Sequence, residues 1–265
     1  MSKFDRIFKN HPPFIGYLTG GDGGIDYCLD CAKALVEGGV DILEIGFPFS
    51  DPIADGPVIE RAHMRALKAG TTASSILEIA RRLRTHTDIP LVLFSYYNPL
   101  LQRGESYLHE AKNAGFDAVL VVDLPPLGAD AFEVDPFFRS LKKANLIPIL
   151  LVTPSTSEER LRLIGQLSEG FIYYVSQKGT TGVRAKLAED FSANLARIRL
   201  HTETPIVGGF GIADQATARH ALQYADGFVV GSAFVKLMEQ QADPSALKLL
   251  ANSIDPREED ECRNS

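Results

Sequence analysis

Two carboxylates stand eleven residues apart, and their surroundings indicate acid–base chemistry. Glu44 lies inside the apolar run 40–46, and Asp55 follows in a loop framed by proline and glycine. A period of two puts Glu44 on the strand face opposite Leu43 and Ile45. A carboxylate that faces a core is costly unless it is paired or protonated, and burial raises its pKa toward the range of a general acid or base.

Both carboxylates also admit purely structural explanations. Glu44 could form a buried ion pair, and Asp55 could be an ordinary turn residue beside Pro52, Gly56 and Pro57. The choice between chemistry and structure depends on the elements that would position the two groups.

Eight apolar runs typical of β-strands alternate along the chain with segments of helical periodicity. This alternation implies parallel pairing with right-handed crossovers, and eight units indicate a closed (β/α)8 TIM barrel, an α/β fold, rather than an open sheet. At 265 residues the chain fits one such domain. The predicted strands are 14–18, 41–46, 90–95, 117–122, 146–152, 171–176, 205–208 and 227–231.

Helical periodicity predicts a helix after almost every strand, with an extra helix before the first strand and another after the last. We expect one catalytic barrel domain over residues 1–254 and a charged, mobile C-terminal tail over 255–265. The predicted helices are 3–8, 25–37, 58–69, 74–84, 105–114, 136–144, 157–167, 187–200, 214–223 and 244–252.

Composition excludes several classes of function. Hydrophobic residues make up 45% of the chain and charged residues 23%, enough for a full core without predicting disorder. The net charge of −7, with no long basic stripe, argues against nucleic-acid and membrane-surface binding. Since there is neither an 18-residue apolar run nor a signal-type N-terminus, we expect a cytoplasmic protein.

Motifs for metals and nucleotide cofactors are missing. Cys28 and Cys31 form a CxxC, but without a second pair or a nearby histidine they are expected to be small buried helix residues. The six histidines form no HExxH pair, and neither a GxGxxG nor a Walker loop opens a helix. We therefore expect no metal and no nucleotide cofactor.

Glycines gather at the ends of the last three predicted strands. Segment 179–182 follows the sixth strand, 208–211 follows the seventh, and Gly231 and Ser232 follow the eighth. In a (β/α)8 barrel, the loops after strands seven and eight and a short helix N-terminus are the usual phosphate site. Each glycine motif alone could serve a turn. Together with Glu44 and Asp55, they predict a catalytic constellation at one end of the barrel.

These motifs occur in a characteristic order over nearly the whole chain. They are Tyr17-Leu18-Thr19-Gly20-Gly21-Asp22, the stretch from Leu43 to Pro57, Tyr96-Tyr97-Asn98, Gly179-Thr180-Thr181-Gly182, Gly209-Phe210-Gly211 and Gly231-Ser232-Ala233. They make the chain resemble the tryptophan synthase alpha chain family. The resemblance implies retro-aldol cleavage of indole-3-glycerol phosphate to indole and glyceraldehyde 3-phosphate in tryptophan biosynthesis. It also implies an α2β2 heterotetramer with a tryptophan synthase β subunit, which would hold the pyridoxal phosphate while this chain holds no cofactor.

The resemblance implies a role for each motif. Glu44 matches the acid/base at indole C3 and the neighbouring hydroxyl, Asp55 matches the carboxylate that accepts the indole N–H, and Tyr173 matches the tyrosine beside the glutamate. Tyr17 and two further apolar side chains would line the indole pocket, although the latter could equally be barrel core; these two are Phe94 and Val175. The implied phosphate cradle is Gly182, Gly209, Phe210, Gly211, Gly231 and Ser232.

Two loops are long for this fold, 47–57 and 177–186, and long loops at the catalytic end are candidate lids. The resemblance implies that closure brings Thr181 against Asp55, and that Asp51 and Asn98 face the β subunit. Departures from the family pattern concern loop rigidity and communication with the partner rather than catalytic charge; they are Gly16, Gly23 and Gln177-Lys178.

Two other functions stay open. The chain could be a catalytically weak subunit that mainly activates a β subunit, although such a subunit could lose the acidic and glycine motifs that are present here. It could also be another phosphate-sugar barrel aldolase or isomerase. A Schiff-base aldolase would need a lysine within a strand, and no predicted strand has one in its interior.

Overall fold

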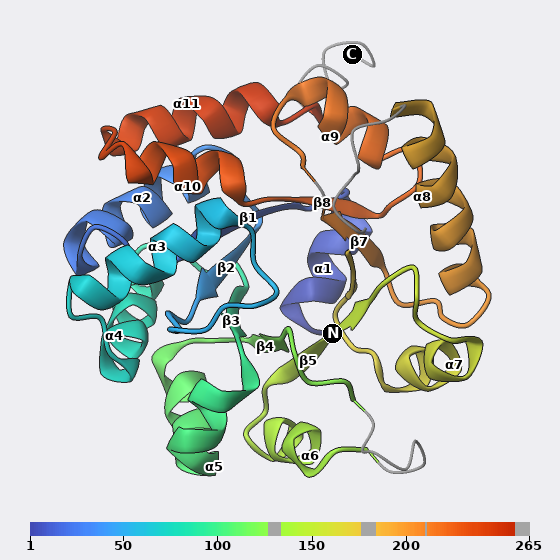
Figure 1. Cartoon of the computed structure of the whole chain (residues 1–265), viewed down its shortest axis with the longest axis horizontal. Coiled ribbons are helices and arrows are strands. Elements are labelled where there is room, and N and C mark those ends of the chain that lie inside the picture. The colour runs from blue at the N-terminus through green and yellow to red at the C-terminus, as the bar shows by residue number, and fades with distance from the viewer. Residues whose placement is uncertain (127–133, 176–183, 210, 258–265) are drawn as a thin grey trace.

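The computed structural model describes residues 1–126, 134–175, 184–209 and 211–257, and for 184–189 it describes the backbone alone. Eight parallel strands close into a barrel in sequence order, and the last pairs with the first (Figure 1). The predicted (β/α)8 fold is therefore confirmed. The strands are β1 (Phe14–Thr19), β2 (Ile42–Gly46), β3 (Leu91–Ser95), β4 (Ala118–Val121), β5 (Ile147–Val152), β6 (Ile172–Val175), β7 (Ile206–Gly209) and β8 (Gly227–Val230).

Helices form a ring around the barrel in Figure 1, and α1 lies across its middle. In the described part of the chain they are α1 (Lys3–Asn10), α2 (Ile25–Glu37), α3 (Pro57–Lys68), α4 (Ala73–Arg84), α5 (Tyr97–Ala114), α6 (Pro136–Lys143), α7 (Glu158–Leu167), α8 (Arg184–Arg199), α9 (Gln215–Ala221), α10 (Ser232–Glu239) and α11 (Pro244–Ile254).

The largest error in the predicted boundaries is at α5, which begins at Tyr97 rather than at residue 105. Gly104 has a φ of 71° and a ψ of −175°, so it breaks the helical backbone and kinks the element. Glycine adopts such a conformation at little steric cost. The helical pattern after the kink was visible in the sequence, but the turn before it was not.

Side chains alternate between two apolar layers, as parallel strands require. Leu43 and Ile45 of β2 pack outward against the helices. Ile42 packs inward with residues from all seven of the other strands and with Phe4 of α1. Helix α1 therefore closes the N-terminal end of the barrel with apolar side chains. The predicted parity of β2 is correct, and it leaves Glu44 facing the barrel interior.

Three aspartates at the N-terminal end of the barrel make the same set of contacts. Asp41, Asp117 and Asp226 each immediately precede a strand. Their carboxylates accept backbone N–H groups at the start of the neighbouring strand, at 2.8, 3.0 and 2.7 Å respectively. Each also pairs with an arginine of the surrounding layer; these are Arg257, Arg84 and Arg199, in the same order. Each of these carboxylates therefore has at least two donors, one of them charged.

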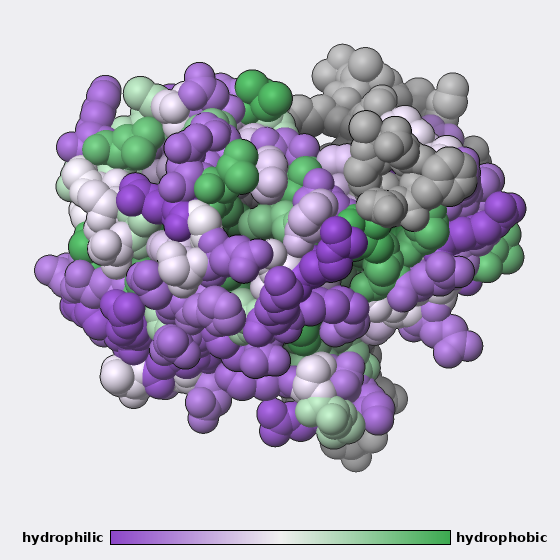
Figure 2. All heavy atoms as spheres, turned by 90° about the horizontal axis from the view of Figure 1, so that it is seen from below, coloured by the Kyte–Doolittle hydropathy of each residue, from purple (hydrophilic) through white to green (hydrophobic). Residues whose placement is uncertain are grey.

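The start of the predicted tail is held by the same layer. Asp255 is buried, and Arg257 bonds to Asp255, to Asp41 and to the Gly39 carbonyl oxygen. Residues 258–265 lie outside the described residues, so the domain boundary at 254 stays a prediction. None of the helices described is long and apolar enough to cross a membrane. The face seen in Figure 2 is mostly hydrophilic with small apolar patches.

Candidate active site

A cavity of about 330 Å³ opens at the C-terminal ends of the strands. It is lined by side chains from strands around the barrel and by the loop after β2. Ten of the predicted site residues surround it: Glu44, Asp55, Tyr173, Tyr17, Phe94, Val175, Gly209, Gly211, Gly231 and Ser232. The fold therefore brings both carboxylates and the glycines after β7 and β8 into one space.

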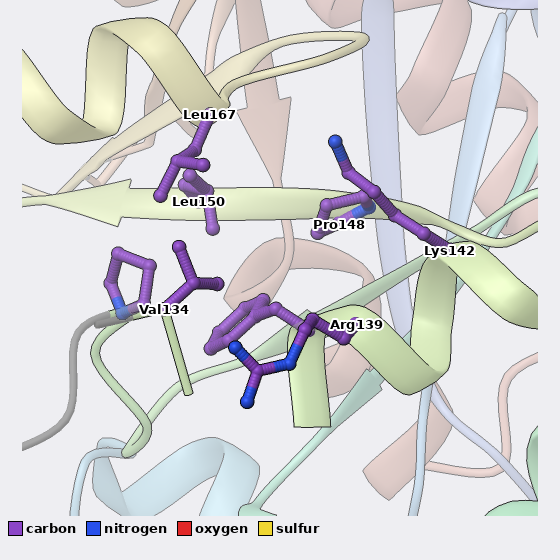
Figure 3. Close-up of a pocket in the computed structure, with 8 residues that line it drawn as sticks. Val134, Arg139, Lys142, Pro148, Leu150 and Leu167 are labelled. Carbon is purple, nitrogen blue, oxygen red and sulfur yellow. The ribbon is translucent and has the colours of Figure 1, made fainter. Parts of the chain in front are cut away.

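A second cavity of about 400 Å³ lies outside the barrel, beside α6 and β5. Figure 3 shows Val134, Leu150 and Leu167 converging on it, with Arg139 and Lys142 at its edge. None of its described lining residues is a carboxylate, a histidine, a serine, a threonine or a cysteine. The described part of its lining has no carboxylate, whereas the cavity in the barrel mouth has two, so the latter is the better candidate.

Glu44 is the most unusual group in the barrel-mouth cavity. Its side chain is fully buried, and neither carboxylate oxygen has a hydrogen-bond partner in the described part of the chain. Burial raises its pKa to about 8, because desolvation penalises the charged form. The ion-pair explanation of Glu44 thus finds no partner among the described residues, and the group is suited to carry a proton near neutral pH.

Asp55 is held differently, by two donors on one oxygen. Its Oδ2 accepts a hydrogen bond from the Tyr96 hydroxyl at 2.8 Å and lies 3.2 Å from Nε2 of His63. Desolvation and the charge of Asp55 raise the pKa of Tyr96, so its hydroxyl remains a donor. Asp55 is more than a turn residue, because its carboxylate is oriented at the edge of the cavity.

Tyr17 and Tyr173, which line the cavity with Glu44, each lie directly against a glycine. A Cβ atom at Gly46 would overlap the Tyr17 hydroxyl, and one at Gly209 would overlap the Tyr173 hydroxyl. Desolvation, followed by the charges of Glu44 and Asp55, raises the pKa of Tyr173, so its hydroxyl stays protonated. Gly209 was predicted in the phosphate cradle, and the structure shows that it also makes room for Tyr173.

The other side of the cavity has exposed backbone. Gly211 has a φ of 57° with open space around it, and Gly231 is the N-cap of α10. The first N–H groups of a helix have no partner within it, and they favour an anion together with the helix dipole. Ser232, the first residue of α10, lines the cavity. These positions agree geometrically with a phosphate cradle.

Some predicted site residues are not in the cavity. Asp51 and Asn98 are exposed and do not line it, as their predicted place at a partner surface requires. Three others, Thr181, Gly182 and Phe210, lie outside the described residues, and their roles stay predictions.

Sequence reasoning assigned no role to His63, Tyr96 and Thr153. His63 and Tyr96 contact Asp55, and Thr153 lines the cavity. The available signal for His63 was its helical phase, because it follows Ile59 by one turn on the buried face of α3. A polar residue at such a position needs a partner.

The closed barrel and the two carboxylates in its cavity define the class of protein, a (β/α)8-barrel enzyme with an acid–base site at the C-terminal ends of its strands. A family model described as tryptophan synthase alpha chain matches residues 5–261. Tryptophan synthase alpha chains from Chlamydia felis and Coxiella burnetii are 62% and 48% identical over 97% of this chain, which covers 100% and 98% of theirs.

Solved structures agree with the sequence comparisons. A Legionella pneumophila tryptophan synthase alpha chain matches with a TM-score of 0.84 and 32% identity, over 96% of both chains. Tryptophan synthase from M. tuberculosis matches with a TM-score of 0.85 and 28% identity, over 97% of this chain and 98% of that one. The chain belongs to the tryptophan synthase alpha chain family, and it is a lyase of tryptophan biosynthesis whose reaction is the cleavage of indole-3-glycerol phosphate.

Proposed function

We propose that the chain is a catalytically active subunit in which Glu44 and Asp55 cleave indole-3-glycerol phosphate to indole and glyceraldehyde 3-phosphate. The single observation that carries this proposal is a buried Glu44 without a partner among the described residues, whose pKa is raised to about 8, in a cavity that Asp55 also lines. At neutral pH such a group holds a proton that it can transfer.

The reaction needs one proton delivered and one removed. Protonated Glu44 gives its proton to indole C3, which turns the ring into an indolenine cation. The resulting Glu44 carboxylate then takes the proton of the hydroxyl on the adjoining carbon. The C–C bond breaks, its electrons return to the ring, and the oxygen becomes the aldehyde of glyceraldehyde 3-phosphate. Glu44 ends protonated, as it began, so no outside acid or base is consumed.

Asp55 stabilises the cation between the two proton transfers. A carboxylate that accepts the indole N–H is most valuable when positive charge is on the ring, so it favours the intermediate over the substrate. Tyr17, Phe94 and Val175 supply the surrounding apolar walls, and the Tyr17 and Phe94 rings meet edge to face at 5.1 Å. Tyr173 lies beside Glu44 and limits the access of water to it.

Gly211, Gly231, Ser232 and the start of α10 bind the phosphate, because exposed N–H groups at a helix terminus match a dianion. The roles of Gly182, Phe210 and Thr181 follow from the resemblance alone. The reaction uses only side chains of this chain, and we propose that pyridoxal phosphate belongs to the β subunit.

A β subunit in an α2β2 complex is the proposed partner, and we place its contact on the face that carries Asp51 and Asn98. Ile53 and Leu101 support this placement, because their side chains are 86% and 54% exposed near these residues in sequence. Large exposed apolar residues are common at protein interfaces. The loop that carries Ile53 also carries Asp55, so a partner could influence the site. A cytoplasmic location stays a prediction.

The test is indole release from indole-3-glycerol phosphate by the purified chain, alone and with a β subunit. An active enzyme releases indole without the β subunit, and Glu44→Gln lowers the rate of release by about 10²- to 10⁴-fold. If the wild-type chain is inactive alone and with the β subunit, yet still stimulates that subunit, it is the weak activating subunit considered above. That subunit would have no use for a buried carboxylate that has no partner among the described residues.

A further inference from the structure

We propose that His63 is a positioning residue which, together with Tyr96, turns one chosen oxygen of Asp55 toward the substrate. This inference rests on the proposed function and adds two residues to its machinery. Both donors meet the same carboxylate oxygen, because the Tyr96 hydroxyl and His63 Nε2 lie 2.8 and 3.2 Å from Asp55 Oδ2. Within the described residues Oδ1 has no hydrogen-bond partner, so it is the oxygen available to an indole N–H.

The hydrogen on His63 is placed by the backbone. Nδ1 of its ring lies 3.2 Å from the backbone N of Phe49, which can only donate. Nδ1 must therefore accept, and in the neutral ring the hydrogen is on Nε2, where it points to Asp55. The ring is buried, with 2% of its side chain exposed, so water does not compete for either nitrogen.

The hydroxyl of Tyr96 is oriented in the same way. It accepts the backbone N–H of Ala54 at 2.9 Å, which leaves its own hydrogen for Asp55. The amides of residues 49 and 54 belong to the loop that carries Asp55, whereas the two side chains belong to α3 and to the start of α5. The backbone N–H groups of the loop thus orient the donor hydrogens of His63 and Tyr96 toward Asp55. The helices hold the two side chains in place.

This arrangement answers a difficulty of the site. Asp55 is on a long loop, and a carboxylate on a loop can rotate its oxygens away from a ligand. Catalytic groups need positions accurate to a fraction of an ångström, and misplacement by about 1 Å can cost about 100-fold in rate. Two donors on Oδ2, each fixed by a second hydrogen bond, restrict that rotation before substrate arrives.

The test compares three variants with wild type. His63→Leu keeps an apolar side chain in the buried site and removes the donor. His63→Gln keeps an amide donor for Asp55, and Tyr96→Phe removes only the hydroxyl. Met64→Leu on the same helix is the control, since Met64 is 45% exposed. We expect His63→Leu and Tyr96→Phe to lower kcat by about 10- to 100-fold and to raise KM by about tenfold, because the hydrogen bond to the indole N–H is also made in the ground state. We expect His63→Gln to recover much of the loss.

A binding measurement separates positioning from mere stability. Calorimetry would compare indole-3-propanol phosphate with its benzothiophene counterpart, which has the same shape but no N–H. Wild type should prefer the indole ligand by at least about tenfold, the contribution of one hydrogen bond to a charged group. In His63→Leu this preference should fall toward one, as it should in Asp55→Ala, and His63→Gln should restore it.

Each outcome decides a different question. If wild type releases no indole, the proposed function fails, while the ligand preference still reports on His63. If wild type is active and His63→Leu keeps both the wild-type kcat and the wild-type preference, the positioning role is wrong and the function stands. If His63→Leu weakens both ligands equally and lowers Tm, His63 is structural only, and the proposal is overturned.

Discussion

At the N-terminal end of the barrel, Asp41, Asp117 and Asp226 each accept a backbone N–H and pair with an arginine, whereas at the C-terminal end Glu44 has no partner among the described residues. Asp22, after β1 and outside the cavity, is also buried and paired, with Arg65 at 2.7 Å. Carboxylates that stabilise the barrel are thus paired with an arginine and with a further donor, either a backbone N–H or a second nitrogen of that arginine. A buried carboxylate without such donors holds a proton near neutral pH instead. This contrast can be tested by substitutions at both ends of the barrel.

The strongest test of the contrast is Glu44→Gln. The amide keeps the shape but cannot transfer a proton, so kcat should fall by about 10²- to 10⁴-fold while the fold survives. Indole release and circular dichroism on the same preparation check both statements. Glu60→Gln, an exposed change on α3, should leave kcat unchanged. A wild-type rate in Glu44→Gln would remove Glu44 from the mechanism.

The second test follows the proton on Glu44 with pH. In the folded chain its pKa is raised from 4.5 to about 8, so between these values folding takes up a proton and stability falls as pH rises. Glu44→Gln lacks this proton uptake. The free energy of unfolding of Glu44→Gln should therefore exceed that of wild type by an amount that is about zero near pH 4.5 and largest above about pH 8. Each unit by which folding raises the pKa contributes about 1.4 kcal/mol to this difference.

Denaturant titrations at several pH values measure this difference. The wild-type kcat/KM should also fall above about pH 8, where free Glu44 loses its proton. A stability difference between Glu44→Gln and wild type that does not change with pH would show that Glu44 titrates normally in the fold.

At the opposite end of the barrel, Asp117→Ala should affect stability alone. It removes the acceptor for the Leu91 N–H and the partner of Arg84. Losing one member of a largely buried pair should cost about 2–4 kcal/mol. Chemical denaturation should show this loss while kcat stays within twofold of wild type. The control is Asp88→Ala, an exposed aspartate nearby. A large drop in kcat without a loss of stability would contradict the division between the two ends.

A smaller effect is expected from Gly211→Val at the proposed phosphate cradle. Its φ of 57° is strained for valine by about 1–2 kcal/mol, and the side chain would enter the space for the phosphate. KM for indole-3-glycerol phosphate should rise at least tenfold, with little change in affinity for free indole. Gly70→Val is the matched control, because Gly70 also has a positive φ, 82°, and open space. Equal weakening of both ligands would argue against a phosphate role.

The smallest effect is expected from Asp51→Ala, which probes the proposed partner face. Asp51 is exposed on the loop that carries Asp55, so a partner contact there could couple to the site. Basal cleavage and Tm should stay unchanged, while mutual activation with a β subunit should fall several-fold. If Tm falls and the activation ratio does not, Asp51 only stabilises its turn, where Ser50 contacts it at 2.5 Å.

The barrel could be predicted from the sequence because its signal is local. Parallel strands buried on both faces appear as short apolar runs, and eight of them alternate with helices. The predicted strands agree with the observed ones to within one or two residues at each end. The error at α5 came from Gly104, since the helix continues on both sides of a residue that looks like a boundary.

Glu44 was visible in the sequence for the same reason, because one charge in an apolar strand violates a local rule. The contacts that distinguish the carboxylates from one another are not local. Tyr96 is 41 residues from Asp55, and Arg84 is 33 residues from Asp117. An aspartate before a strand and an aspartate in a loop therefore look alike until the chain is folded.

By itself, then, the sequence determined the family, the barrel and the face on which Glu44 lies, since each depends on residue order and side-chain period. Only the tertiary structure decided that Glu44 has no partner in the described part of the chain, that His63 and Tyr96 contact the same oxygen of Asp55, and that Gly209 makes room for Tyr173. The physical reason is that burial and hydrogen bonding depend on which distant segments meet, and these two factors set the proton affinity and direction of a carboxylate.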